Sequence, residues 1–249
     1  MYEIIILSLI QGVTEFLPVS SSSHLIIFSE FSKFSNKSLS IDVSLHIGSF
    51  LAVIIFFRKD IINVIDNKKL FFKIFVASIP VMIFGFFLVQ MNLIDNLRNI
   101  KVIGWTTLLF GILLYFSDKF KLEKSIENNF NYKTALFIGL FQIFSLIPGV
   151  SRSGITITAA RILNFKRFDS ARISFLMSIP TLGAVSIFGL NNIIQSDDLN
   201  FSIINLLAIF LSFAFSFITI KYFLKFVKNF SLKIFVIYRI LLGTLILFL

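Results

Sequence analysis

Residues 15–24 read Glu-Phe-Leu-Pro-Val-Ser-Ser-Ser-Ser-His, and residues 148–154 read Pro-Gly-Val-Ser-Arg-Ser-Gly. Each of these polar runs interrupts an apolar stretch, which covers 4–29 in the first case and 134–160 in the second. Within a bilayer, backbone that is not helical is tolerated only where protein buries it or where it lines a watery cavity. We therefore expect both stretches to be re-entrant helical hairpins, each entering and leaving on one side of a membrane.

The composition is that of a membrane protein. Of the 249 residues, 57% are hydrophobic and 14% are charged, with a mean hydropathy of +0.92. Soluble domains have about 45–50% apolar and about 25% charged residues, so a water-soluble globular enzyme is excluded. The absence of cysteine excludes disulfides, thiolate metal sites and cysteine nucleophiles. The net charge of +10 does not indicate a nucleic-acid partner, because no basic run is long enough to follow a phosphate backbone.

We expect six further charge-poor segments to be membrane-spanning helices, of which 43–57 is shorter than the others. They cover residues 43–57, 74–94, 102–117, 173–196, 199–220 and 234–249. Four of the loops between these segments hold four Lys or Arg each, sixteen in all, and they are 58–70, 117–133, 161–172 and 221–233. The opposite side holds only Lys33, Lys37, Arg98 and Lys101. By the positive-inside rule, the basic loops face the cytoplasm and both termini lie outside.

The sequence repeats itself at an offset of about 130 residues. Residues 47–56 resemble 179–188 and residues 109–116 resemble 241–248, both at an offset of 132. The two polar runs also correspond, since Pro18 and Pro148 each precede a serine cluster. We expect one integral membrane domain, 1–249, with repeat one at about 1–120 and repeat two at about 130–249. Each repeat has an odd number of crossings, so the second is inverted, and the two broken hairpins meet near the membrane midplane.

The polar runs contain the residues that we expect to be functional. Glu15, His24 and Arg152 are ionisable groups at membrane depth, where such groups are costly and functional by default. Hydroxyl groups accompany them at Ser20, Ser21, Ser22, Ser23, Ser151, Ser153 and Thr156. Each proline ends a helix, and a serine then caps the next one, whose free N–H groups form an anion site. Two such helix starts with Arg152 between them favour a phosphate or diphosphate ligand, because Arg binds phosphate oxygens in pairs.

Two spacings within the first run indicate catalytic chemistry. Ser21 and His24 share a helix face if a helix begins near Ser20, which suits a nucleophile and its proton acceptor or donor. Gln11 and Glu15, four residues apart, also share a face. That pair could orient His24, activate water, or hold a divalent ion that bridges phosphate oxygens.

These residues resemble the undecaprenyl-diphosphate phosphatases, the bacitracin-resistance proteins of bacteria. The resemblance covers Gln11-x-x-x-Glu15 with the following Phe-Leu-Pro-Val-Ser-Ser, then Pro148 to Gly154, Ser174-Phe-Leu176 with Pro180, and Tyr238-Arg239. It implies removal of one phosphate from the C55 isoprenyl diphosphate, which recycles the lipid carrier used in peptidoglycan and cell-wall synthesis. It also implies an inverted-repeat fold in the bacterial inner membrane, a divalent cation (Mg²⁺ or Ca²⁺), and a site opening to the outer face.

The resemblance also suggests a role for each site residue. Ser21 would be the nucleophile, His24 its acid/base partner and Glu15 the key carboxylate. Phosphate would be bound by Arg152 with Ser151, Ser153 and Thr156, together with the helix-start serines Ser20 and Ser22. Glu15 and Gln11 would hold the metal, although relatives often have Glu where this chain has Gln11. Ser23 stands where relatives commonly have Gly.

Several alternatives stay open at this point. Glu15 and Arg152 could form an ion pair that only holds the two hairpins together. A polyprenyl-phosphate flippase would use the same inverted repeat without hydrolysis. A channel gives Ser21 and His24 no role, and a phosphatase for phosphatidic-acid-like lipids is excluded only by the resemblance. The sequence does not decide whether Ser21 or water attacks phosphorus, or whether the protein forms a homodimer. We expect His46 to bond a neighbouring backbone group.

Overall fold

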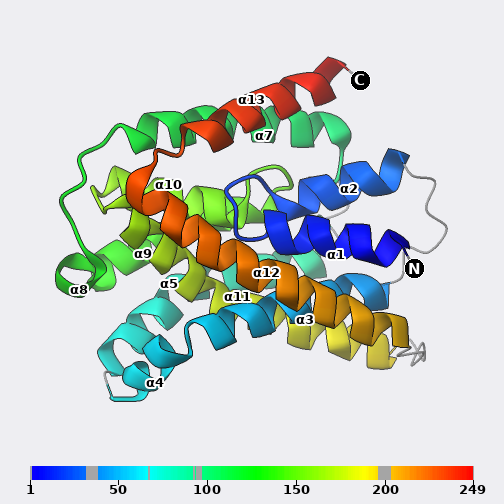
Figure 1. Ribbon diagram of the computed structural model, residues 1–249, viewed down its shortest axis with the longest axis horizontal. Helices are drawn as coiled ribbons and strands as arrows, with labels where there is room; N and C mark the ends of the chain where they lie inside the picture. Colours follow the sequence, from blue (N-terminus) through cyan, green and yellow to red (C-terminus); the bar gives the residue numbers. More distant parts are fainter. Residues whose placement is uncertain are drawn as a thin grey trace.

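The computed structural model describes residues 2–31, 39–66, 68–91, 93, 97–195 and 203–248. Within these ranges the chain is helical and has no strand, apart from one isolated bridge between Lys124 and Phe165. The helices form one elongated bundle (Figure 1). This agrees with the expected all-helical membrane architecture.

Both interrupted stretches form helical hairpins. The first consists of α1 (Tyr2–Thr14) and α2 (Ser21–Phe31), and the second of α9 (Tyr132–Gln142), the short 3₁₀ turn η1 (Ile143–Leu146) and α10 (Arg152–Ile162). At 1.5 Å per residue, even α1 with its 13 residues is about 20 Å long, too short to cross a hydrocarbon core of about 30 Å. The hairpins enter the bundle from opposite ends, and their turns meet in its interior (Figure 1).

Five long helices are apolar enough to span a membrane. They are α3 (Leu39–Phe56), α5 (Lys68–Gln90), α7 (Ile100–Asp118), α11 (Arg167–Gln195) and α12 (Ile203–Asn229). The sixth expected span forms α13 (Lys233–Phe248), whose 16 residues are only about 24 Å long. Two small helices, α4 (Arg58–Asp66) and α8 (Ile126–Asn129), complete the described fold.

Helices of the two halves pack on one another in matching pairs. Helix α1 packs on α12 and α9 packs on α5, while α3 packs on α12 and α11 on α5. In the internal repeat, which has an offset of about 131 residues, α1 corresponds to α9, α3 to α11 and α5 to α12. The α1–α12 contact therefore corresponds to the α9–α5 contact, and the α3–α12 contact corresponds to the α11–α5 contact. Small residues make these contacts close, because a Cβ on Gly12 would meet α12 and one on Gly139 would meet the backbone of Ala77 in α5.

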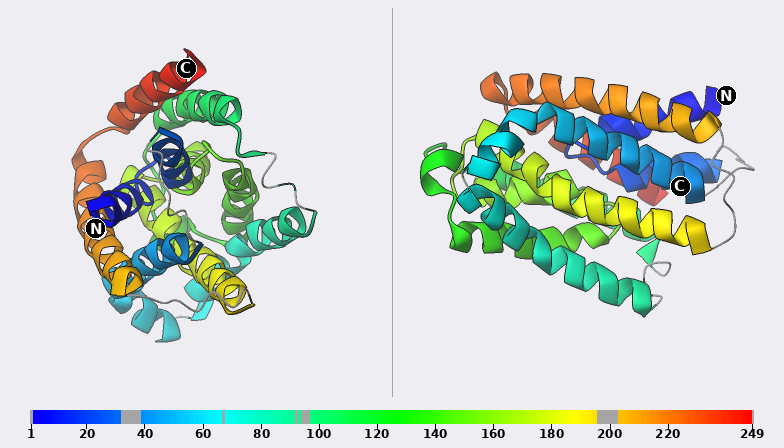
Figure 2. Two further views of the ribbon diagram at one scale, coloured as in Figure 1. Left: turned by 90° about the vertical axis from the view of Figure 1, so that its right-hand side faces the viewer. Right: turned by 90° about the horizontal axis from the view of Figure 1, so that it is seen from below.

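The second hairpin supplies the centre of the bundle. Every residue of α10 from Ser153 to Arg161 is buried, and α10 contacts α7, α9 and α11. Viewed end-on, α2 and α10 lie near the middle with the long helices around them (Figure 2). The main hydrophobic core includes Phe16 of the first hairpin turn, which packs edge-on against Phe175 of α11 with ring centroids 5.2 Å apart.

The buried carboxylate of Asp118 ties the basic end of the bundle together. It accepts two hydrogen bonds from Arg167, at 2.6 and 3.1 Å, and one from the backbone N–H of Leu232, at 3.0 Å. Arg161 lies 3.6 Å from the same carboxylate and also donates to the carbonyls of Phe120 and Phe165. Three helices and the turn before α13 therefore meet at one charge.

All four basic segments lie at this end, and both chain termini lie at the opposite end (Figure 1). We therefore predict that the two ends face opposite sides of a membrane. Because the chain has no cysteine, single substitutions can report this directly. Tyr2 is 72% exposed at the terminal end, and Lys121 has a side chain 79% exposed at the basic end.

An impermeant maleimide added to intact spheroplasts should label Tyr2→Cys, and it should label Lys121→Cys only after the membrane is permeabilised. Labelling of both variants from one side would contradict the arrangement.

Candidate active site

The two hairpin turns have the same local design. Ser20 (φ 75°) and Ser151 (φ 71°) both adopt the left-handed conformation that L-residues rarely enter, and a helix begins at the next residue in each case. Ser151 caps its helix as expected, since its Oγ accepts the N–H of Gly154 at 3.1 Å. The turns also touch, because Ser153 Oγ donates to the carbonyl of Leu17 at 2.7 Å. The N-termini of α2 and α10 are thus brought to one place.

Arg239 of α13 holds both turns. It is fully buried, and its guanidinium donates to the carbonyls of Pro18, Val150, Gly149 and Thr107 at 2.9 to 3.2 Å. These carbonyls belong to irregular backbone or a helix, and the Arg239 side chain gives them a buried partner. Gly149 fits here because its φ is +94° and an added Cβ would overlap Thr106 Oγ1. The sequence signal for this role was a lone arginine inside an apolar segment.

A polar cavity of about 210 Å³ lies where the turns meet. Six of the residues predicted from sequence line it, namely Glu15, Ser20, Ser21, Ser22, Ser151 and Arg152. Four polar residues that we had not assigned to the site join them: His46, Gln142, Ser145 and Thr181. The remaining lining is apolar and comes from α5, η1 and α11. The cavity therefore combines groups from both halves of the chain.

Glu15 is the centre of the polar contacts in this cavity. Its Oε1 accepts a 2.6 Å charged hydrogen bond from Arg152, and its Oε2 accepts the hydroxyl of Ser21 at 2.6 Å. Gln11, whose amide also donates to Oε2 at 3.1 Å, shares a helix face with Glu15 as expected. The same amide donates to Nδ1 of His46 at 3.1 Å, so the imidazole of His46 faces the cavity rather than a backbone group. The serine hydroxyl is thus paired with a carboxylate.

His24 lies elsewhere. Its Nδ1 donates to the carbonyl of Ser20 at 2.6 Å, so Nε2 of the neutral ring accepts the Tyr238 hydroxyl, 2.5 Å away. The two rings are also stacked, 5.7 Å between centroids. We expected His24 to be the proton partner of Ser21, but this structure gives that contact to Glu15. The i, i+3 spacing placed both residues in the first turn of α2 correctly, but the imidazole bonds the Ser20 carbonyl and Tyr238 and does not line the cavity.

Ser153 and Thr156 are also directed away from the cavity. Both are fully buried, and the Ser153 hydroxyl bonds the first turn while Thr156 Oγ1 donates to Ser174 Oγ at 2.7 Å. We expected both to bind phosphate, whereas here their hydroxyls join α10 to its neighbours. The internal repeat could have revealed Gln142, because it matches Gln11. Both polar atoms of the Gln142 side chain are buried without a partner in the described structure.

The donor set favours a divalent cation only together with a phosphorylated ligand. Among the described residues, no three His, Asp or Glu side chains cluster as a metal site. Glu15 is the one carboxylate in the cavity lining, and Arg152 already balances its charge. The Oε1 atom of Gln11, whose side chain bonds Glu15 but does not line the cavity, is buried without a partner. Mg²⁺ commonly uses one or two carboxylates plus substrate phosphates, which matches this supply of oxygens.

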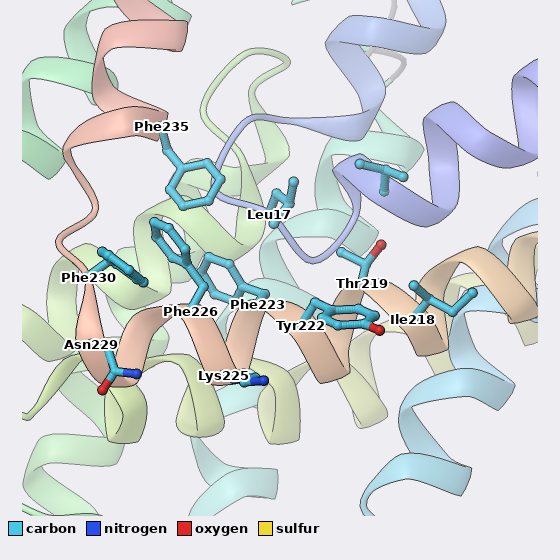
Figure 3. A pocket seen from close by; sticks show the side chains of 11 residues that line it. Leu17, Ile218, Thr219, Tyr222, Phe223, Lys225, Phe226, Asn229, Phe230 and Phe235 are labelled. Carbon is cyan, nitrogen blue, oxygen red and sulfur yellow. The ribbon is translucent and has the colours of Figure 1, made fainter.

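A larger groove lies on the other side of the first turn (Figure 3). Its volume is about 570 Å³, and Val13, Leu17, Ile218 and several phenylalanines of α12 and α13 line it. Lys225 is the one basic residue in the lining of the groove, and the lining contains no carboxylate. The groove therefore offers an apolar surface rather than catalytic groups.

Comparison with known proteins shows the family of the chain. The family described as "Bacitracin resistance protein BacA" matches residues 4–245. The chain belongs to the BacA family. A BacA relative from Pelagibacter ubique (strain HTCC1062), named undecaprenyl-diphosphatase, is 51% identical over 98% of this chain and 95% of its own length. Proteins with the same name from Saccharophagus degradans and Jannaschia sp. are 41% and 38% identical, over 96% and 99% of this chain and 94% and 97% of their own lengths. This BacA-family chain is a multi-pass membrane protein.

For this BacA-family protein we predict that Arg239→Met destabilises the fold strongly. Methionine fills much of the space but leaves four buried carbonyls without their donor, at a cost of about 1–3 kcal/mol for each group that stays unpaired. The thermal unfolding midpoint in detergent should fall by many degrees. Lys101→Met, an exposed site outside the turns, should leave the midpoint within a degree or two. An unchanged midpoint for Arg239→Met would show that the turns are held by other contacts.

Proposed function

We propose that this protein hydrolyses undecaprenyl diphosphate to undecaprenyl phosphate and inorganic phosphate, and so recycles the cell-wall lipid carrier. The observation that carries the proposal is the convergence of Glu15, Ser21 and Arg152 at two helix N-termini in one cavity. Cation, hydroxyl and carboxylate are the groups that phosphoryl transfer needs, and a purely structural Glu15–Arg152 pair would need no hydroxyl beside it. The names of the three relatives support the same reaction.

The terminal phosphate would lie between the two helix starts. The N–H groups in the first turns of α2 and α10 have no partner within their helices and carry the positive end of the dipole. Arg152 adds a fixed positive charge, and Ser20, Ser22 and Ser151 add hydroxyl donors around it. An incoming phosphate replaces the Glu15 carboxylate at Arg152. That exchange frees Glu15 while the site keeps its ion pair.

Ser21 would then attack the terminal phosphorus. Glu15 Oε2 already accepts the Ser21 proton at 2.6 Å and takes it as the new O–P bond forms. The bond from phosphorus to the bridging oxygen breaks, and undecaprenyl phosphate leaves with that electron pair. Water next attacks the phosphoserine, restores the hydroxyl and releases inorganic phosphate. In a direct mechanism, Glu15 would activate the water instead, and Ser21 would only position the phosphate.

His24 would act through position rather than by contact with the substrate. Its bonds to the Ser20 carbonyl and to Tyr238 fix the first turn of α2, on which Ser21 lies. A divalent cation, Mg²⁺ or Ca²⁺, would be held by Glu15 and Gln11 Oε1, with the remaining ligands supplied by the diphosphate. Its chemistry would be to neutralise charge on the phosphate oxygens.

The isoprenoid chain would lie in the apolar groove of Figure 3. Val13 and Leu17 line this groove, whereas Glu15, between them in sequence, lines the polar cavity. Leu17 and Glu15 are two residues apart, so their Cα atoms lie at most about 7 Å from one another. A lipid with a diphosphate head and an apolar tail needs both kinds of surface near one another.

For the membrane arrangement we propose six crossings and two inverted repeats around a twofold pseudo-axis in the membrane plane. The paired helix contacts between the halves support this, and α13 would complete its crossing by packing along α7. The basic end would face the cytoplasm of a bacterial inner membrane, with both termini outside. The cavity would open to the outer face, because Val185, in its lining, lies nearer to Gln195 than to Arg167.

The mutants that separate the mechanisms can be tested by phosphate release from purified protein in detergent. Arg152→Lys keeps the charge but loses the planar fork, and activity should fall by about a hundredfold or more. Ser21→Ala should be at least as damaging, and combining it with Glu15→Gln should add little, because the two act as one unit. Ser22→Ala is the matched control and should be mild, and a chelator should abolish activity in every variant that is active.

Near-normal release by Ser21→Ala would eliminate the serine as nucleophile and leave the water mechanism. No release by the wild-type protein, with binding retained, would instead favour a flippase.

The groove can be tested by filling it. Ile218 of α12 is 51% exposed in the groove, and Ile204 of the same helix is 48% exposed outside it. Ile218→Trp should lower kcat/KM for undecaprenyl diphosphate by about tenfold, with a smaller effect on the shorter farnesyl diphosphate, because less chain needs the groove. Ile204→Trp should change neither value. Equal losses for both substrates, or none, would place the isoprenoid chain elsewhere.

A further inference from the structure

A second polar cavity lies at the basic end of the molecule, apart from the candidate active site. Its volume is about 660 Å³, and the end of α7, residues 119–123 and the turn before α13 surround it. It has no lining residue in common with the cavity around Glu15. Nothing in the proposed reaction uses it.

Cations dominate the lining of this cavity. Lys119, Lys121, Arg167 and Lys233 line it, against two carboxylates, Asp118 and Glu123. Both carboxylates are already engaged. Asp118 is held by Arg167, Arg161 and the N–H of Leu232, and Glu123 lies 3.5 Å from Lys121.

Lys119 and Lys233 therefore contribute uncompensated positive charge. No ion pair joins either ammonium to a carboxylate within the described part of the chain. Lys119 Nζ lies over the ring of Tyr115, 4.2 Å from its centroid, which keeps this charge at the cavity wall. The two ammonium groups can therefore attract an anion whose oxygen atoms accept their hydrogen bonds.

Apolar side chains form the rest of the cavity. Phe120 and Leu122 are 46% and 45% exposed, and Val236 and Tyr115 lie beside them. Phosphate on an apolar body would satisfy both kinds of lining. Basic pockets between membrane helices at the cytoplasmic side are suited to lipid head groups for this reason.

We propose that this cavity binds a phosphate group, held by Lys119 and Lys233. The apolar wall and the position at the end of the long apolar helix α7 favour the head group of an anionic phospholipid as its source, and inorganic phosphate is the other source of the same chemistry. The proposal is independent of hydrolysis in the candidate active site.

The test is calorimetric titration of the purified full-length protein with three probes: short-chain phosphatidylglycerol, short-chain phosphatidylcholine and inorganic phosphate. The variant is Lys119→Gln/Lys233→Gln. The control is Lys59→Gln/Lys133→Gln, which removes the same charge from exposed positions outside the lining of the cavity. Phosphatase activity of both double variants should equal that of the wild type, which also shows that they are folded.

We expect phosphatidylglycerol to bind the wild type and the control alike, and the Lys119/Lys233 variant at least tenfold more weakly, with the difference shrinking at high salt. The same loss for inorganic phosphate would support the site and name free phosphate as a ligand, and a loss confined to phosphatidylglycerol would name the lipid. Equal affinities of the two double variants for every probe would overturn the proposal, as would phosphatidylcholine binding that follows the same pattern as phosphatidylglycerol.

Discussion

The guanidinium of Arg239 donates hydrogen bonds to backbone carbonyls in both hairpin turns at once, and the remaining structure depends on that contact. Helix ends inside a membrane leave backbone groups that lipid cannot bond. Here the carbonyls of Pro18, Gly149 and Val150 point at one buried side chain from α13. Because the two turns share this donor, their following helices begin side by side. The proposed phosphate site is thus a consequence of how Arg239 stabilises the two turns.

The charges of the candidate site are balanced before any ligand arrives. Arg152 and Glu15 come from different hairpins, and the pair is stable in a low-dielectric interior only because each has further polar partners. In the proposed mechanism a dianionic phosphate takes the place of the carboxylate at Arg152, and the displaced Glu15 carboxylate is then neutralised by the Ser21 proton or by the divalent cation. The Glu15–Arg152 pair of the empty cavity would therefore become part of the proposed catalytic site once phosphate binds.

Much of this could be read from the sequence, and the part that could not has a physical reason. Both hairpins could be predicted because Pro18 and Pro148 each precede a serine cluster. The spacing of Gln11 and Glu15 predicted a shared helix face, which their hydrogen bond confirms. The sequence could not show the direction of His24, Ser153 and Thr156, because their hydrogen-bond partners Tyr238, Leu17 and Ser174 come from other parts of the fold. The place of His46 in the cavity could not be predicted from the sequence, because His46 lies in α3 and is connected to the site by its contact with Gln11.

The cross-packing of the two halves has a consequence for biogenesis. Helix α1 rests on α12, which the ribosome completes some two hundred residues later, and the partner of Glu15 lies 137 residues further along the chain. The first hairpin thus leaves the translocon with a carboxylate whose arginine partner has not yet been made. It must wait at the membrane surface or beside the insertion machinery until the second half arrives. Assembly of this protein is then a late event, in which closing the bundle and completing the polar centre are one step.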